Sequence, residues 1–505
     1  MSERDAYTKI LEHMREGALL SSTAALVAWD QETGMPSGAG PRRAEQLALL
    51  AGLAHARASD ERLGDWLGAC EEDDQLDADQ QANVRELRRD YDRATKLPAD
   101  LVAELAATES RAQQAWGEAR AKSDFASFAP MLESMVQLQQ RKADCLKRDG
   151  QQRWDALADL YEPGMQAADL QELFGPLRNR LVSLRERLDQ GSSPPAETLK
   201  RRKIAKAKQE SFVRAVVTQM GFSLERGRID ESAHPFCTTA GGSLDVRLTT
   251  RFHDDDVLDA LGSTMHEGGH GLYEQGLPSE PFGTPKCEAV SLGIHESQSR
   301  LWENHIGRSS SFWQWCWPLA QQHLGSDCGG SEGIDAHEAF RQSNRVAPSL
   351  IRVEADEATY DLHVMVRFEI EQALIAGELA IADLPAKWNA LYRDYLGVDV
   401  PDDRRGCLQD VHWSCGLFGY FPTYTLGNLY AAQFAAAAES ALGDLSGHVA
   451  RGEFGPLREW LAEHVHRHGR RFSPAELCRR ATGKSLSSEP FLDYLEAKLL
   501  PIYGV

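Results

Sequence analysis

Two histidines four residues apart, His266 and His270, bracket a glutamate in the stretch TMHEGGHGLYEQG (264–276). On a helix this spacing puts both imidazoles on one face, where they can bind a single zinc ion. Glu267 then lies beside them, in a position to take a proton from metal-bound water. Chance also produces such a match in roughly a few per cent of chains with this histidine content, so further ligands are needed to support the site.

A zinc site of this kind needs a third protein ligand, and a catalytic site leaves its fourth position to water. The residues after the second histidine lack the glycine and histidine of the metzincin pattern, so we look for a carboxylate on a following helix. Glu296 lies 26 residues after His270 within a helical pattern and is the ligand that we expect. Glu288 and Glu303 are the alternatives, because a single acid on a helix usually faces solvent.

The helix that must carry the two histidines can begin at Asp254–Asp256, whose side chains are suited to capping. Its expected buried face holds Leu258, Leu261, Met265 and Leu272. Gly268, Gly269 and Gly271 each cost roughly 1 kcal/mol relative to alanine in a helix interior. Close approach of a neighbouring backbone, or the metal itself, must therefore compensate for the glycines.

Helical periodicity dominates the rest of the chain, as in PADLVAELAATESRAQQAWGEARAK (98–122). The pattern breaks most clearly in GSSPPAET (191–198), which we interpret as a boundary or a surface linker. We expect one domain (1–505) with a largely helical N-terminal part (1–198) and a zinc-containing catalytic part (199–505).

One segment, residues 230–252, predicts a strand instead of a helix. Leu244, Val246 and Leu248 alternate there with Asp245, Arg247 and Thr249. Such alternation is typical of a half-buried strand with one apolar and one polar face. The chain is therefore predicted to be mainly α with one small sheet.

The composition argues against several classes of partner. The chain has 76 acidic and 55 basic residues, a net charge of -21 that repels nucleic acid and anionic membranes. Its nine cysteines are scattered without CxxC pairs, which favours reduced thiols. We see no secretion signal and no run of about 18 apolar residues, so we expect a cytoplasmic protein.

Several motifs together resemble the carboxypeptidase Taq family of zinc metallocarboxypeptidases. They are WDQETGMP (29–36), HPF (234–236), DVRLT (245–249), HEGGH (266–270), HESQ (295–298), IRVEAD (351–356) and GCLQDVHW (406–413). The resemblance implies a mainly α, two-lobed fold with a deep central cleft, similar to neurolysin-like peptidases. It also implies zinc, with cobalt able to substitute, a homodimer, and broad removal of C-terminal residues from peptides with a free C-terminus.

Motif position also implies roles for individual residues. His266, His270 and Glu296 are implied as metal ligands and Glu267 as the general base. The polar residues of the DVRLT motif, Asp245, Arg247 and Thr249, are implied to face substrate, although alternation alone would favour a solvated outer face. His234, in the HPF motif, is a further expected substrate contact.

An exopeptidase must also recognise a free carboxylate, for which arginine offers a planar two-pronged donor. Arg352 in the IRVEAD motif is our first choice for this role. Arg247 is the second choice, and only their membership in motifs separates the two from the other arginines of the chain.

The segment GCLQDVHWSCGLFGYFPTYTLGN (406–428) offers donors for the oxyanion that forms when water attacks the scissile carbonyl. We expect His412 and Tyr420 to be catalytic and Tyr424 to contact the substrate, the alternative being that these rings only pack. Asp410 is expected to orient a histidine or an arginine. His295, next to the proposed ligand Glu296, is expected to support the site or contact the substrate.

The function that we expect is hydrolysis of the last peptide bond, with Glu267 acting as base and then returning the proton to the leaving amine. Two alternatives remain open. One is an endopeptidase or dipeptidyl carboxypeptidase with the same zinc site, and the other is a catalytically silent protein that binds peptides or metal.

Overall fold

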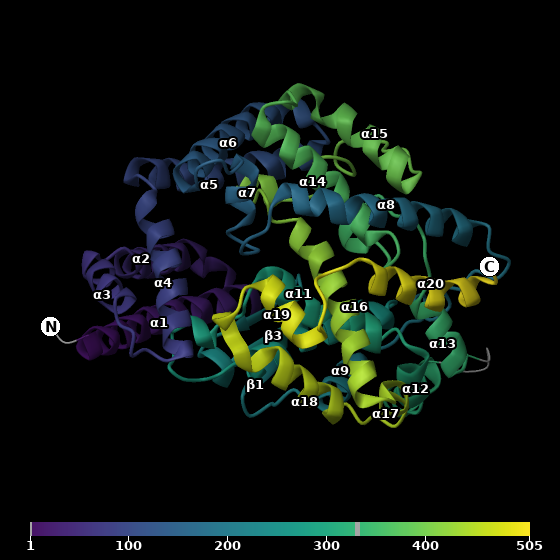
Figure 1. Cartoon of the computed structure of the whole chain (residues 1–505). Helices are drawn as coiled ribbons and strands as arrows, with labels where there is room; N and C mark the ends of the chain where they lie inside the picture. Colours follow the sequence, from purple (N-terminus) through teal and green to yellow (C-terminus); the bar gives the residue numbers. More distant parts are fainter. Residues whose placement is uncertain (1–2, 329–333) are drawn as a thin grey trace. The chain divides into compact units, whose positions relative to one another are not determined.

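Helices make up most of the protein (Figure 1), as the apolar periodicity of the sequence predicts. The computed structural model describes residues 3–328 and 334–505. Within these residues the strands form a three-stranded sheet, so the predicted mainly α fold with one small sheet is confirmed. None of the described helices combines the length and the apolar character that crossing a bilayer requires.

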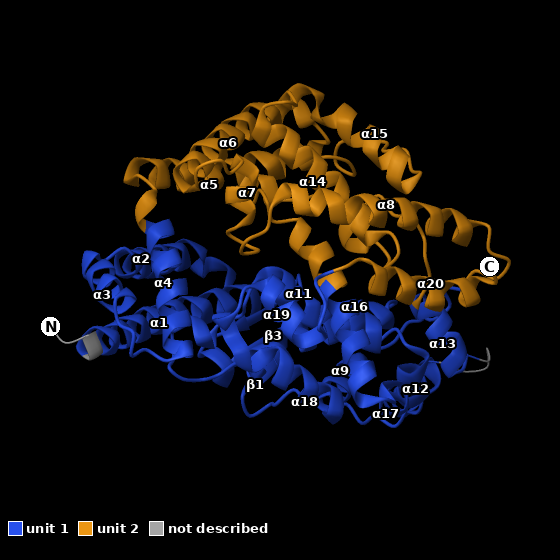
Figure 2. Ribbon diagram, in the orientation of Figure 1, with its two compact units in different colours: residues 1–94, 195–343, 430–486 blue, residues 95–194, 344–429, 487–505 orange. Residues whose placement is uncertain are grey.

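The chain divides into two compact units, each built from three separate stretches (Figure 2). Unit 1 comprises residues 1–94, 195–343 and 430–486, and unit 2 comprises residues 95–194, 344–429 and 487–505. Two units agree with the two lobes that the family resemblance implies. One crossing, between Pro194 and Pro195, falls within the segment 191–198 where the helical pattern breaks. The expected single domain and the central cleft stay predictions.

Unit 1 holds the sheet and most of the helices. These helices are α1 (Glu3–Thr33), α2 (Gly40–Ala58), α3 (Glu61–Glu71), α9 (Lys206–Met220), α10 (Val257–Gly276), α11 (Leu292–Arg300), α12 (Ser310–Leu324), α13 (Ala336–Ser343), α17 (Leu445–Ala450), α18 (Gly455–His464) and α19 (Pro474–Thr482). Two more helices, α4 (Ala78–Lys96) and α16 (Pro422–Leu442), begin in one unit and end in the other.

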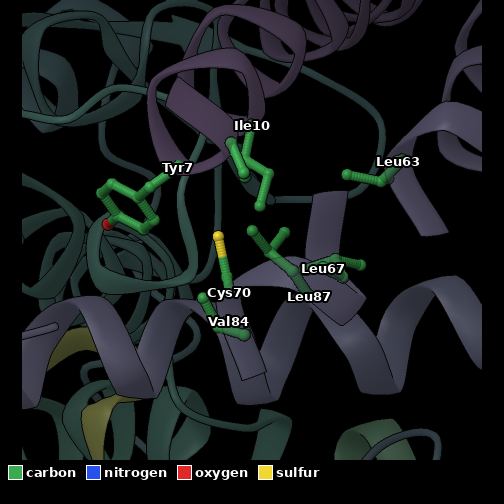
Figure 3. Close-up of a cluster of buried hydrophobic side chains, with 8 residues drawn as sticks. Tyr7, Ile10, Leu63, Leu67, Cys70, Val84 and Leu87 are labelled. Atoms are coloured by element: carbon green, nitrogen blue, oxygen red, sulfur yellow. The ribbon is translucent and has the colours of Figure 1, made fainter. Parts of the chain in front are cut away.

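A compact apolar cluster joins α1, α3 and α4 (Figure 3). Its side chains are Ala6, Tyr7 and Ile10 from α1, Leu63, Leu67 and Cys70 from α3, and Val84 and Leu87 from α4. The α3 members are three or four residues apart, which is the spacing that puts them on one face of a helix. Burial of this face keeps the first helices of the chain together.

The sheet has the strand order β1–β3–β2. β1 (Gly227–Glu231) pairs parallel with β3 (Val246–Thr250), and β2 (Cys237–Thr239) pairs antiparallel with it. The predicted strand is therefore correct in place but wrong at its start, because Leu244 lies in a short 3-10 turn (Gly242–Leu244) and is 59% exposed.

The predicted polar face of this strand is also wrong at Thr249, which is fully buried. Its hydroxyl oxygen accepts a hydrogen bond from the Phe236 N–H at 2.9 Å, and the Ser232 hydroxyl oxygen lies 2.7 Å from it. These internal partners satisfy the hydroxyl, so a polar side chain occupies a position that the alternation assigned to an outward face.

Unit 2 is helical in all of its regular elements. They are α5 (Ala99–Lys122), α6 (Phe125–Leu146), α7 (Arg153–Ala158), α8 (Ala167–Asp189), α14 (Tyr360–Ala376), α15 (Leu384–Leu396) and α20 (Glu489–Tyr503). α5 begins directly after Pro98, as the sequence predicts.

Candidate functional site

The predicted helix through the two histidines is α10, which runs from Val257 to Gly276. The Asp256 carboxylate caps it by accepting a hydrogen bond from the Asp259 N–H at 3.0 Å. Leu261, Met265 and Leu272 are buried, so the predicted apolar face is confirmed for these three.

The glycines of α10 lie where neighbouring elements leave no room for a side chain. A Cβ at Gly269 would meet the Gln298 carbonyl oxygen at 2.6 Å, and one at Gly268 would meet the Val217 side chain at 2.7 Å. At Gly271 the Leu248 side chain of β3 would be 2.8 Å away. Close packing therefore accounts for the glycines, and at Gly269 the neighbour is the backbone of α11, as predicted.

His266, His270 and Glu296 form one cluster, with their nearest ligand atoms all within 4.8 Å of one another. Glu296 Oε2 lies 3.8 Å from His266 Nε2 and 3.6 Å from His270 Nε2. In a tetrahedral zinc site with ligand distances of about 2.1 Å, the donor atoms are about 3.4 Å apart. The two distances to Glu296 are within a few tenths of an ångström of this value, and the donors fit such an ion in type and number.

The two alternative ligands are engaged elsewhere. The Glu303 carboxylate accepts a hydrogen bond from His266 Nδ1 at 2.9 Å, and its other oxygen accepts one from Arg308 at 3.1 Å. Glu288 accepts a hydrogen bond from Arg470 at 2.9 Å. Glu303 thus orients the proposed ligand His266 by accepting a hydrogen bond from its Nδ1 atom.

Both imidazoles are held from outside the cluster. His270 Nδ1 donates to the His295 carbonyl oxygen at 3.0 Å. Since each Nδ1 is held by an oxygen acceptor, each Nε2 lone pair is left to point into the cluster. Arg300 Nε donates to Glu296 Oε1 at 2.7 Å, which leaves Oε2 to face the histidines.

His295 supports the cluster with its side chain as well. Its ring stacks on the His270 ring at a centroid distance of 4.3 Å, and its Nε2 is 2.8 Å from Glu274 Oε1. This arrangement agrees with the expectation that His295 supports the site.

Glu267 is buried beside the cluster, with only 6% of its surface exposed. No described residue makes a hydrogen bond to its Oε2 atom. Burial raises the pKa of Glu267 to about 7. A carboxylate with this pKa is suited to exchange protons near neutral pH.

The electrostatics of the ligands differ from one another. Burial lowers the pKa of His270 to about 3, which keeps its imidazole neutral. Burial also lowers the pKa of His266, but the charge of Glu296 and the hydrogen bond to Glu303 outweigh it, and the pKa is raised. The pKa of Glu296 is lowered although burial opposes this, chiefly because Arg300 lies beside it. The cluster thus contains an ionised carboxylate before any cation binds.

The remaining candidates of unit 1 lie on and before β3. Arg247 donates to both oxygens of Asp245, at 3.0 and 2.8 Å, and its guanidinium lies 4.4 Å from the centre of the Trp29 ring. His234 is exposed, and its carbonyl oxygen accepts a hydrogen bond from Ser232. The positive charge of Arg247 is therefore balanced by the carboxylate of Asp245.

The candidates of unit 2 include the other arginine. Arg352 is 4% exposed and donates from Nε and Nη2 to Asp410 Oδ1 at 3.1 and 2.9 Å. Arg367 donates from Nε to the other oxygen of Asp410 at 2.7 Å. The guanidinium groups of Arg352 and Arg367 therefore both donate to the one carboxylate of Asp410. These hydrogen bonds agree with the expectation that Asp410 orients an arginine.

The structure brings His412, Tyr420 and Tyr424 together in unit 2. His412 Nε2 lies 3.4 Å from the Tyr424 hydroxyl, and the Tyr420 ring lies 5.4 Å from the His412 ring and 5.5 Å from the Tyr424 ring. Burial lowers the pKa of His412 to about 4, so this imidazole is neutral near pH 7.

Sequence reasoning missed Arg300 and Arg367. Arg300 follows Glu296 by four residues, a spacing that predicts an ion pair on a helix. Arg367 lies in YDLHVMVRFEIEQALIA, a helix that is otherwise rich in apolar residues. A charge in such a helix requires a buried partner, which was an available signal.

Comparison with known proteins gives a consistent result. Residues 9–499 match the model of the carboxypeptidase Taq (M32) metallopeptidase family. Thermostable carboxypeptidase 1 of Thermus thermophilus is 46% identical, with 100% of both chains covered, and carboxypeptidase 1 of Bacillus subtilis is 36% identical, with 96% of both covered. The crystal structure of the M32 carboxypeptidase from Deinococcus radiodurans superposes with a TM-score of 0.96 at 41% identity, covering 99% of this chain and 100% of the other.

Proposed function

Because the chain belongs to the carboxypeptidase Taq (M32) family of metallopeptidases, we propose that it is a zinc enzyme that releases C-terminal amino acids of many kinds, with Glu267 as general base. The observation that carries this proposal is the cluster of His266, His270 and Glu296 with Glu267 buried beside it. Two imidazoles and one carboxylate are the ligands that catalytic zinc takes in peptidases. Cobalt has similar ligand preferences, and we propose that it substitutes.

A divalent ion held by these three ligands would supply Lewis acidity, which polarises the scissile carbonyl and lowers the pKa of the attacking water. Glu267 then accepts the proton of that water at Oε2 and delivers it to the nitrogen of the leaving amino acid. Burial supports the transfer in both directions, because a pKa of about 7 lets the carboxyl group hold and release a proton.

We propose that Arg352 binds the terminal carboxylate of the peptide. Asp245 already matches Arg247 with two hydrogen bonds, whereas Arg352 and Arg367 share the single carboxylate of Asp410. A second carboxylate would balance the additional positive charge. Arg247 remains the second choice.

His412 and Tyr420 are proposed to donate hydrogen bonds to the oxyanion. A neutral imidazole suits this role, since it keeps one N–H and adds no charge that the site would have to balance. Tyr424, Asp245, Arg247 and His234 are proposed as substrate contacts. We no longer expect Thr249 to contact the peptide directly, because its buried hydroxyl bonds to Phe236 and Ser232.

Three further properties of the protein are proposed from the family resemblance and the composition. They are a homodimer, a cytoplasmic location, and the absence of nucleic-acid and membrane partners. The nine cysteines are all free, which supports a reducing compartment.

A pair of peptides tests the carboxypeptidase proposal, one with a free C-terminal acid and one with an amide. Charge-assisted bonds to the acid are worth roughly 1.5–3 kcal/mol, and an unpaired arginine adds a desolvation cost, so we expect kcat/KM to be about 100-fold higher for the acid. Arg352→Ala should remove most of this ratio and Arg247→Ala should retain it. Equal cleavage of both peptides by the wild type, with products longer than one residue, would favour the endopeptidase alternative.

A further inference from the structure

Helix α14 carries a row of polar side chains that are all buried. Tyr360, His363, Arg367 and Glu371 recur every three or four residues, and the last three are 0% exposed. This spacing puts them on one face of the helix. A buried polar row is costly unless each member has partners, so the partners indicate what the row does.

Glu371 accepts three N–H hydrogen bonds and contacts three different parts of unit 2. Its Oε1 accepts from Trp413 Nε1 at 2.8 Å. Its Oε2 accepts from the Gly419 backbone N–H at 2.9 Å and from Trp154 Nε1 in α7 at 3.4 Å. Burial raises the pKa of Glu371 to about 7, and these donors oppose the rise.

Arg367, one turn earlier on α14, holds the same stretch of chain at its other end through Asp410. The segment 410–419 is thus fastened to one helix at Asp410, Trp413 and Gly419. His412 lies between the first two of these points, and Tyr420 follows the third directly.

The segment needs such fastening because it contains little regular structure. Its one regular element is the short 3-10 turn His412–Cys415, and Gly416 and Gly419 follow with positive φ angles of 69° and 81°. A Cβ at Gly419 would lie 2.6 Å from the Ala158 backbone nitrogen, so the chain here packs directly on α7. The hydrogen bond from the Gly419 backbone N–H to Glu371 therefore fixes the position of the backbone directly before Tyr420.

We propose that Glu371 is a positioning residue, which fastens the segment 410–419 to α14 and α7 and thereby fixes His412 and Tyr420 for the reaction. This inference rests on the proposed function, in which these two side chains stabilise the oxyanion. Both oxygens of Glu371 receive N–H donors, so only an acceptor at each position satisfies the site. Glutamine has nearly the same shape but would turn an NH2 group towards one of the donors.

Glu371→Gln is the test, with Asp361→Asn as the matched control. Asp361 is also a buried carboxylate of α14, and it accepts a hydrogen bond at 2.9 Å from Asn428, which lies outside the segment 410–419. We expect Glu371→Gln to lower kcat about 10- to 100-fold and to leave KM within about threefold of wild type. A small displacement of catalytic groups such as His412 and Tyr420 reduces the rate of the chemical step by about this factor. Metal content should be unchanged in both variants, and kcat should be unchanged in the control.

Two further measurements separate positioning from general damage. In protein labelled with fluorotryptophan, the 19F signal of Trp413, assigned with Trp413→Phe, should shift in Glu371→Gln and stay in place in Asp361→Asn. In the double variant of Glu371→Gln with Tyr420→Phe, kcat should fall little below that of Tyr420→Phe alone, because both changes act on one group.

Three results would overturn the inference. The first is a kcat in Glu371→Gln no lower than in the control, and the second is an unchanged Trp413 signal. The third is a double variant whose loss of kcat equals the product of the losses in Glu371→Gln and Tyr420→Phe. If Tyr420→Phe and His412→Ala both retain full kcat, the oxyanion role itself fails and the positioning role fails with it. If those two variants lose kcat and Glu371→Gln does not, only the positioning role fails.

Discussion

Adding a single methyl group at Gly269 should weaken metal binding, although alanine is a better helix former than glycine. A Cβ at this position would meet the Gln298 carbonyl oxygen at 2.6 Å and Ser299 Cα at 2.7 Å. Both atoms belong to the backbone of α11, so no side-chain rotation can relieve the contact. The same helix carries Glu296, and the strain therefore acts on a proposed metal ligand.

The size of the effect follows from the distances. Ordinary contacts begin at 3.4 Å, so the two helices must separate by about 0.8 Å from the 2.6 Å contact. Metal sites tolerate about 0.2 Å in ligand distance. Alanine regains about 1 kcal/mol of helix propensity, while overpacking costs about 1–3 kcal/mol. We expect metal affinity to fall at least about tenfold, as it does when an outer partner of a ligand is lost.

Gly262→Ala is the matched control, because it lies on the same helix and, apart from the backbone of α10 itself, no atom of the described residues lies within 4 Å of the added Cβ. It should leave metal affinity unchanged and stabilise the metal-free protein by up to about 1 kcal/mol. Competition with a chelator of known affinity measures metal binding, and urea unfolding of the metal-free variants measures stability. If Gly269→Ala binds metal as tightly as Gly262→Ala, close packing against α11 does not set the position of Glu296.

Three other predictions concern the same cluster. Glu267→Gln should keep its metal and lose at least about 100-fold in kcat, and retention of more than about a tenth of the activity would contradict the role of general base. Glu303→Gln should weaken metal binding about 10- to 100-fold, because His266 loses the partner that orients it. Glu288→Gln is the control and should leave metal binding unchanged, because Glu288 is paired with Arg470. Equal metal affinities of these two variants in a chelator competition would refute this prediction. Metal binding at pH 7 should release protons, because a cation favours ionised Glu267 and neutral His266, whose pKa values are raised in the metal-free protein. Calorimetry in buffers of different ionisation enthalpy counts these protons, and Glu267→Gln should release fewer.

The sequence predicted α10 well because three independent signals agree there. A capping aspartate, an apolar face and the paired histidines all require the same helix. The third ligand was harder to choose, since Glu288, Glu296 and Glu303 carry the same functional group. In the structure, the packing of α11 against Gly269 distinguishes them, and that contact depends on the tertiary fold.

The strand was predicted less well because polarity and exposure are different quantities. Thr249 is polar and buried, and Leu244 is apolar and 59% exposed. Thr249 can be buried because Phe236 and Ser232 bind its hydroxyl group, and the periodicity of β3 does not reveal these partners. The pairing of Arg352 with Asp410 was invisible for the same reason, since the two are 58 residues apart.

The order of the stretches along the chain has a consequence for synthesis. A ribosome releases the last stretch of unit 1 before the last stretch of unit 2, which contains α20. Tyr503 of α20 accepts a hydrogen bond from the Val346 N–H at 2.6 Å, and Arg180 of α8 bonds to Glu489 and Glu496. Neither unit is a continuous piece of chain, so neither can finish folding while most of the other is still unmade. Nascent chains of this protein therefore expose unfinished helical surfaces until α20 has been made, and chaperones have most reason to bind them before that point.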